Sequence, residues 1–189
     1  MEHVKSGEIG IRPATDRDID LLLTWVNDPS VSPFWCGSHR MIERGELLRD
    51  LEDCFFDGSD PDKGRSYIIE DEARPVGIIS YTNGSGNVDA GRDIAEIDIL
   101  IAGEENQNRG LGTAALRYLI AILFEVMGFH SILANTYSFN IRMRRCLEKL
   151  GFIEEGSICG VDPTNGEYLE EVSYGLLNED LWPVSINSQ

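Results

Sequence analysis

The stretch Ile94–Met127 reads IAEIDILIAGEENQNRGLGTAALRYLIAILFEVM, and we expect the rest of the chain to be arranged around it. Apolar and polar residues alternate over Ile94–Ile101, which is typical of a strand. A short polar turn follows, and the remainder carries apolar residues at the spacing of a helix face. The stretch therefore predicts a strand, a turn and a long helix in succession.

The turn Gln107–Thr113 is the first candidate binding site. Gly110 and Gly112 carry no side chain that would hold a ligand away from the backbone N–H groups. The helix that follows adds unpaired N-terminal donors and the positive end of its dipole. This combination indicates a pyrophosphate site. An ordinary tight connection stays open as the alternative, because Gln-x-x-Gly-x-Gly matches neither the dinucleotide fingerprint nor the nucleotide-triphosphate loop.

A second motif, NIRMRRCLEKLGF, occupies Asn140–Phe152. Asn140 is a suitable N-cap for a helix over Ile141–Leu150, and Gly151 is a suitable stop. Together the two motifs resemble the conserved blocks of the GNAT superfamily of N-acetyltransferases, over roughly the C-terminal half of the chain. The resemblance implies an α/β (mixed α+β) fold with a twisted mixed sheet, flanked by helices and splayed open after its fourth strand. It also implies acetyl-CoA (coenzyme A) as the cofactor and N-acetyl transfer as the reaction.

The same resemblance implies a set of cofactor-binding residues. They are Ile99, Leu100, Ile101, Gln107, Asn108, Arg109, Gly110, Leu111, Gly112, Thr113, Asn135, Asn140 and Arg145. One position departs from the family, because Leu147 stands where a tyrosine usually protonates the departing thiolate. Tyr137 and Ser138 are the nearest alternative donors, and water is another, since a thiol of pKa about 8.5 needs only modest help to leave.

Two acidic residues of the central strand are the candidate catalytic groups. Glu96 and Asp98 are two positions apart, so they lie on the same face of the strand. One carboxylate can hold a cationic acceptor while another accepts the proton of its reacting amine. A polar face turned to solvent is the alternative explanation of the pattern.

A closer resemblance points to the aminoglycoside 6'-N-acetyltransferases. It rests on Glu-Ile-Asp-Ile-Leu-Ile from Glu96, on Asn-Arg-Gly-Leu-Gly-Thr from Asn108, on Thr-Trp-Val-Asn from Thr24, and on the pair Phe34-Trp35. It implies that Asp98 contacts the reacting amine as the base. The implied substrate-binding residues are Trp25, Asp28, Trp35, Tyr81 and Asp98, although aromatic residues here could equally serve as core anchors.

Two other functions stay open. The sequence Leu-Glu-Lys-Leu-Gly-Phe, which begins at Leu147, resembles a motif common in the branch that acetylates ribosomal-protein N-termini. A deep acidic pocket closed by residues 31–37 and 82–93 favours a small cationic acceptor, and an open slot favours a peptide. Leu147 also leaves open a non-catalytic sensor that binds acyl-CoA.

The remaining elements are expected from local patterns. We predict strands over residues 8–13, 65–70, 74–81, 131–134, 152–158 and 169–176, and helices from Thr15 to about residue 26 and from 40 to 55. Thr15 and Asp18 have the spacing of a capping box. Residues 31–37 and 82–93 are predicted loops, the second one mobile.

Length and composition limit the remaining choices. The 189 residues suit one domain over 1–178 with a polar tail over 179–189. The net charge of −17 argues against a nucleic-acid partner and is compatible with a cationic ligand. Four scattered cysteines and three histidines indicate neither a disulfide framework nor a metal site. With no membrane-spanning run or secretion signal in the sequence, we expect a cytoplasmic protein, monomeric or homodimeric, without membrane contact.

Overall fold

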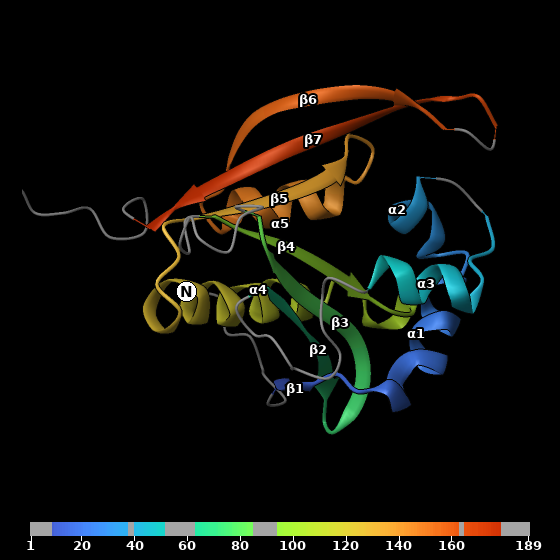
Figure 1. Ribbon diagram of the computed structural model, residues 1–189, viewed down its shortest axis with the longest axis horizontal. Coiled ribbons are helices and arrows are strands. Elements are labelled where there is room, and N and C mark those ends of the chain that lie inside the picture. Colours follow the sequence, from blue (N-terminus) through green and yellow to red (C-terminus); the bar gives the residue numbers. More distant parts are fainter. Residues whose placement is uncertain (1–8, 38–39, 52–62, 85–93, 163–164, 179–189) are drawn as a thin grey trace, which may run out of the picture.

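Seven strands form one mixed sheet, in the order β1-β2-β3-β4-β5-β7-β6, among the residues that the computed structural model describes: 9–37, 40–51, 63–84, 94–162 and 165–178 (Figure 1). The strands are β1 (Ile9–Pro13), β2 (Gly64–Asp71), β3 (Arg74–Asn83), β4 (Ile94–Ile101), β5 (Ser131–Tyr137), β6 (Ile153–Val161) and β7 (Tyr168–Leu177). The helices are α1 (Ile19–Val26), α2 (Ser32–Cys36), α3 (Arg44–Asp50), α4 (Leu111–Ala121) and α5 (Ile141–Lys149), with 3-10 turns at Asp16–Asp18 and Glu104–Asn106. The expected mixed α/β fold is confirmed.

The sheet opens between β4 and β5, which are its parallel pair. They are joined at only three residue pairs, and the last of these is Glu96 with Leu133. Beyond that point β4 stays paired with β3 as far as Ile101, and β5 stays paired with β7 as far as Tyr137. The splay after the fourth strand that we expected is therefore present.

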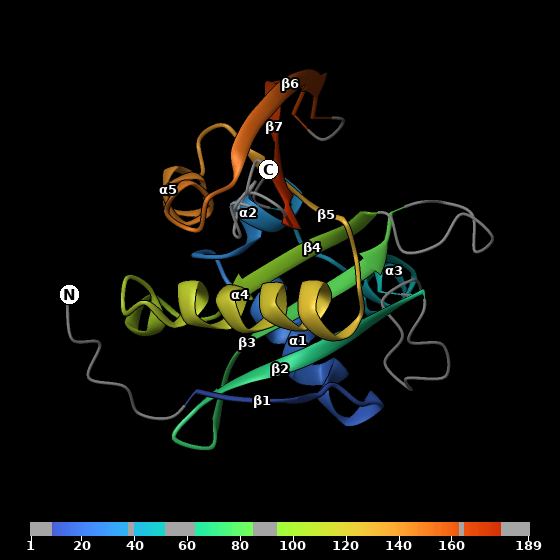
Figure 2. The ribbon, with the colours of Figure 1, turned by 90° about the vertical axis from the view of Figure 1, so that its left-hand side faces the viewer.

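The two faces of the sheet are covered by different helices (Figure 2). Ala95 and Ile97 of β4 pack in a large core with α4. Leu100, on the opposite face of β4, packs with α1 and α3 in a second, smaller core. Because side chains alternate along a strand, Glu96 and Asp98 share the face of Leu100, toward α1 and α3.

Local sequence signals account for several of the connections. Thr15 and Asp18 form the expected capping box at the turn that leads into α1. The β2–β3 hairpin turns at Glu72 and Ala73, both with positive φ (50° and 62°), as a two-residue turn of type I′ requires.

α4 is the helix that the central stretch predicts. It continues into a π-helical turn, Ile122–Val126, and the segment stops at Gly128, whose φ is 77°. No helix in the described part of the chain has both the length and the apolar content needed to cross a membrane.

Three elements differ from our expectations. Residues 31–37 are not simply a loop, because α2 forms there and ends at Gly37, which has the left-handed φ of 76° that favours glycine. α3 begins at Arg44 rather than at residue 40, since the Glu43 carbonyl accepts its first backbone hydrogen bonds, from Glu46 and Leu47. β5 extends to Tyr137 because its pairing with β7 continues past Ala134. The expected helix end at 55 and most of the loop 82–93 lie outside the described residues.

Candidate active site

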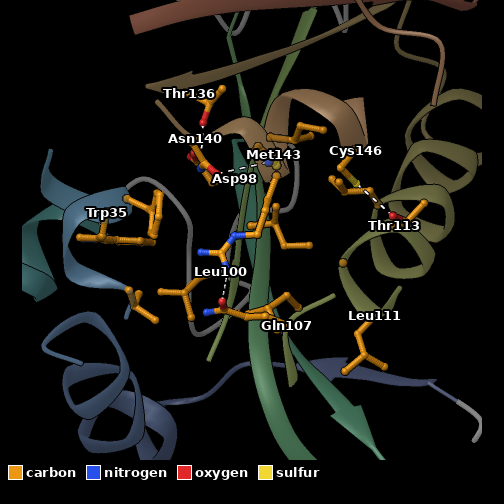
Figure 3. A pocket seen from close by; sticks show the side chains of 18 of the residues that line it. Trp35, Asp98, Leu100, Gln107, Leu111, Thr113, Thr136, Asn140, Met143 and Cys146 are labelled. Carbon is orange, nitrogen blue, oxygen red and sulfur yellow. Dashed lines mark hydrogen bonds between the residues drawn. The ribbon is translucent and has the colours of Figure 1, made fainter. Parts of the chain in front are cut away.

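The opening between β4 and β5 contains a pocket of about 530 Å³. Its walls come from β4, from the turn before α4, from β5 and α5, and from α2 (Figure 3). In this view Trp35 lies on one side and Thr113 and Cys146 on the other, with Asp98 and Asn140 between them. The sequence-predicted residues that line the pocket are Trp35, Asp98, Ile99, Leu100, Ile101, Gln107, Asn108, Gly110, Leu111, Gly112, Thr113, Asn135, Tyr137 and Asn140.

The glycine turn is shaped to expose its backbone to the pocket. Gly110 has a φ of 83°, and a Cβ built on it would meet no atom within 4 Å. Asn108 also has a positive φ, of 58°. α4 begins at Leu111, so the N–H groups of its first turn have no intrahelical acceptor. These open donors suit a pyrophosphate, which the backbone here can approach without obstruction.

Arg109, which lies in the same turn, does not line the pocket. Its guanidinium forms a 2.9 Å ion pair with Asp71 at the end of β2, and it donates a 3.4 Å hydrogen bond to Asn106. Asp71 is buried. The arginine that we expected to bind the cofactor therefore ties the turn to the β2–β3 hairpin.

Asn140 has a double role at the start of α5. Its side-chain oxygen accepts a 3.2 Å hydrogen bond from the Met143 N–H, which confirms the expected cap. Its amide nitrogen donates a 3.1 Å hydrogen bond to the hydroxyl of Thr136 on β5. These bonds hold the side chain at the pocket wall, as suits the cofactor-binding role that the resemblance implies for Asn140.

α4 and α5 meet through a cysteine. Cys146 Sγ and Thr113 Oγ1 are 3.1 Å apart, and both residues line the pocket. Burial raises the pKa of the Cys146 thiol, so it stays protonated at neutral pH. The next residue, Leu147, is fully buried in the large core. Leu147 is not among the lining residues, so no proton donor reaches the pocket from this position.

Asp98 is the carboxylate that faces the pocket from β4. It lies opposite Ser80 of β3, which lines the same wall. Desolvation by burial, followed by the charges of Glu96 and Glu171, raises the pKa of Asp98 to about 6. The side chain is open to the water of the pocket, although protein surrounds the pocket itself. At pH 7 to 8 the carboxylate is ionised and able to accept a proton.

Glu96 lies on the same face as Asp98, as expected, but it is not a lining residue. Its Oε1 accepts a 2.8 Å hydrogen bond from the side-chain amide of Asn135 on β5. Glu96 also belongs to the last residue pair between β4 and β5. The bond therefore joins the two strands at the point where the sheet opens.

Tyr137 closes the pocket from β5. Its ring stacks on Phe139 at 5.3 Å, with 2° between the ring planes. A Cβ built on Gly37, at the end of α2, would lie 3.1 Å from the Tyr137 hydroxyl. Burial, followed by the nearby charge of Glu171, raises the pKa of this phenol. The hydroxyl therefore keeps its proton at neutral pH, and the raised pKa makes it a weaker acid than a free phenol. Ser138, the other candidate donor, is not among the lining residues.

Three of the predicted substrate-binding residues are not part of this pocket. Tyr81 is 1% exposed on the α4 face, where its ring meets Phe129 edge-on, because strand alternation turns it away from the Ser80 side. Trp25, a residue of α1, is buried in the smaller core. Asp28 accepts hydrogen bonds from the N–H and hydroxyl of Ser30, and these lower its pKa. Arg145 on α5 is exposed and also does not line the pocket.

Other lining residues were not predicted as site residues. They include Ser80, Thr136, Met143, Cys146 and Glu171, whereas Phe34 belongs to the aromatic pair that the resemblance singled out and Arg142 to the basic helix α5. Arg142 donates a hydrogen bond to the Gln107 side chain, and its guanidinium lies 5.1 Å from the ring centroid of Phe34. The sequence signal for Phe34 was its pairing with Trp35, and the signal for Arg142 was the basic composition of α5. Glu171 had no local signal, because its place depends on the pairing of β7 with β5.

Known proteins match this chain in sequence and in fold. The acetyltransferase (GNAT) domain model matches residues 8–153. An uncharacterised N-acetyltransferase of Bacillus subtilis is 30% identical over 180 residues, which are 94% of this chain and 98% of that protein. An aminoglycoside N(6')-acetyltransferase type 1 of Klebsiella pneumoniae is 26% identical over 161 residues, which are 82% of this chain and 78% of that protein.

Among solved structures, the spermidine N-acetyltransferase of Vibrio cholerae, in complex with CoA and spermine, superposes with a TM-score of 0.73 at 19% identity. The match covers 93% of this chain and 98% of that one. At this identity it is evidence for the fold alone. The domain model spans most of the chain and includes β4, the glycine turn and α5, and on this ground the chain belongs to the GNAT family of acetyltransferases.

Proposed function

We propose that this chain transfers an acetyl group from acetyl-CoA to a primary amine of a cationic small molecule, with the 6'-amino group of an aminoglycoside as the leading acceptor. The observation that carries the proposal is the position of Asp98. A carboxylate with raised pKa faces a pocket that runs from the glycine turn to the aromatic side chains of α2. The base and the site proposed for acetyl-CoA therefore share one cavity.

Acetyl-CoA, the acetyl donor, is expected to lie between α4 and α5. The backbone N–H groups at Gly110–Thr113 would hold the pyrophosphate, and Asn140 would contact the pantetheine arm. β4 loses its partner strand after Glu96, so its free edge near Ile99–Ile101 offers backbone N–H groups to the thioester carbonyl. These groups would stabilise the oxygen as it becomes negative.

The chemistry assigned to the side chains is proton transfer. The amine nitrogen attacks the thioester carbon, the C–S bond breaks, and an amide and a thiol result. Asp98 takes the proton that the amine loses, directly or through one water. Tyr137, a protonated phenol at the pocket wall, returns a proton to the leaving thiolate. Much of the acceleration is expected from holding the two substrates together.

The part of the pocket proposed to hold the amine acceptor favours a small molecule over a protein N-terminus. α2 brings Phe34 and Trp35 to the pocket, and Asp98 and Glu171 supply negative charge. Aromatic faces and carboxylates together suit a cationic ring compound or a polyamine. The curated relative that acts on aminoglycosides supports the first of these, and the spermidine enzyme keeps the second as an alternative.

A non-catalytic acyl-CoA sensor has less support. The sequence reason for that reading was Leu147, and its side chain is buried in the core rather than in the pocket. Tyr137 supplies a proton donor from another element.

The test is thiol release from acetyl-CoA with kanamycin, spermine and N-terminal peptides as acceptors. We expect turnover with kanamycin above that with any peptide, and a raised kanamycin tolerance in bacteria that express the chain. Activity on peptides alone would replace this proposal with the N-terminal acetyltransferase. Binding of acetyl-CoA without turnover of any amine would support the sensor.

A further inference from the structure

A second carboxylate reaches the pocket from the far side of the opening. Glu171 of β7 lies opposite Tyr137 of β5 in the antiparallel pairing, and it lines the same pocket as Asp98. Its neighbour Val172 is buried in the large core with α4, so Glu171 is on the other face of the sheet. Asp98 is on that face too, because Ile97 is in the same core as Val172. Because the sheet opens between β4 and β5, Asp98 lies on one wall of the pocket and Glu171 on the other.

The basic side chains near these two walls interact with other residues. Arg142, which lines the pocket, is hydrogen-bonded to Gln107 and lies over the ring of Phe34. Arg40, whose charge acts on Tyr137, forms a 2.7 Å ion pair with Glu46. Within the described ranges no basic side chain forms an ion pair with Asp98 or Glu171. The pocket therefore offers an incoming ligand two negative groups.

The charge of Glu171 acts on both side chains that are proposed to transfer protons, Asp98 and Tyr137. It contributes to the raised pKa of Asp98 on β4 and to that of Tyr137 on β5. A positive group bound at Glu171 would therefore lie within electrostatic range of the base and of the phenol. An acceptor with one amine can neutralise only one of the two walls.

We propose that Glu171 is a specificity-determining residue, which binds a second ammonium group of the acceptor while Asp98 receives the reacting amine. The inference rests on the proposed function and deepens it, because it selects diamines and polyamines over monoamines of the same length. Tyr137 and the rings of α2 line the same pocket as the two carboxylates.

The chain provides a matched control beside this residue. Glu170 is also exposed and also on β7, but it is not a lining residue, and its Oε1 accepts a 2.8 Å hydrogen bond from Ser157 on β6. Glu171→Gln and Glu170→Gln remove the same charge from adjacent positions. Any general effect of net charge on a cationic substrate is therefore common to both variants.

The experiment measures thiol release with saturating acetyl-CoA and two series of acceptors, linear diamines and linear monoamines with three to six carbons. We expect the unmodified chain to prefer diamines, with an optimum chain length that reflects the separation of the two carboxylates. Glu171→Gln should lower kcat/KM for the best diamine by about tenfold or more, mainly through KM, as loss of a charged hydrogen bond implies. Its kcat/KM for monoamines, and that of Glu170→Gln for every amine, should stay within about twofold.

Two results would overturn the inference and leave the proposed function standing. One is an equal loss on monoamines and diamines in Glu171→Gln, and the other is no diamine preference in the unmodified chain. An unchanged KM for acetyl-CoA in Glu171→Gln shows that the variant has folded. If the unmodified chain acetylates none of the amines, including kanamycin and spermine, the proposed function itself fails and the inference fails with it.

Discussion

The side-chain amide of Asn135 donates a 2.8 Å hydrogen bond to Glu96 Oε1 and thereby joins β4 and β5 where their pairing ends. One carboxylate of the acidic pair is therefore engaged between strands, and the other, Asp98, is left to face the pocket. The two acids that the sequence places on one face thus have different surroundings.

Glu96→Gln distinguishes the roles of the two acids. A glutamine keeps an oxygen that can accept from Asn135 but removes the negative charge that helps to raise the Asp98 pKa. We expect substantial activity to remain and the acidic limb of the pH profile of kcat/KM to move to lower pH. If Glu96 is itself the base, the variant loses nearly all turnover at every pH.

Asp98→Asn tests the base directly. An amide cannot take the amine proton, so we expect kcat to fall by about 10²- to 10⁴-fold, the usual contribution of a general base. Calorimetric affinity for coenzyme A should be nearly unchanged. Equal losses of turnover and coenzyme A affinity would contradict this role.

The unmodified chain should show a matching pH dependence. Asp98 has a raised pKa of about 6 and acts as a base only when ionised. Activity should therefore be present above that pH and fall as the pH drops through it. Asp98→Asn should lose this limb.

Tyr137→Phe tests the proton donor. Phenylalanine keeps the ring that stacks on Phe139 and removes only the hydroxyl. Because a thiol of pKa about 8.5 is already a fair leaving group, we expect kcat to fall by only about tenfold. Ser138→Ala serves as the control, since Ser138 does not line the pocket, and kcat should be unchanged in it. Equal effects in the two variants would remove Tyr137 from the mechanism.

Arg109 and Asp71 should act on the cofactor as one unit. Their 2.9 Å ion pair holds the glycine turn against the β2–β3 hairpin. We expect Arg109→Ala and Asp71→Asn each to raise the KM for acetyl-CoA, and the double variant to be little worse than either one, because residues in direct contact are not additive. A loss in Arg109→Ala that Asp71→Asn does not share would indicate direct contact of the arginine with phosphate.

Several features of this protein were determined by the sequence alone. The alternation over Ile94–Ile101, the glycines of the turn and the cap at Asn140 each depend on residues a few positions apart, so period and backbone preference were enough to predict β4, α4 and α5. The placement of Asp98 followed from the same alternation. Gly110 has the positive φ for which glycine is suited.

The tertiary structure decided the rest, because it depends on contacts between residues far apart in the chain. Arg109 turns to Asp71, 38 positions away by the numbering, and Glu171 reaches the pocket through the register of β7 on β5. Tyr81 misses the pocket because one step along a strand reverses the face. Local pattern specifies which way a strand or helix presents its residues, but only packing between elements brings two of those faces to one cavity.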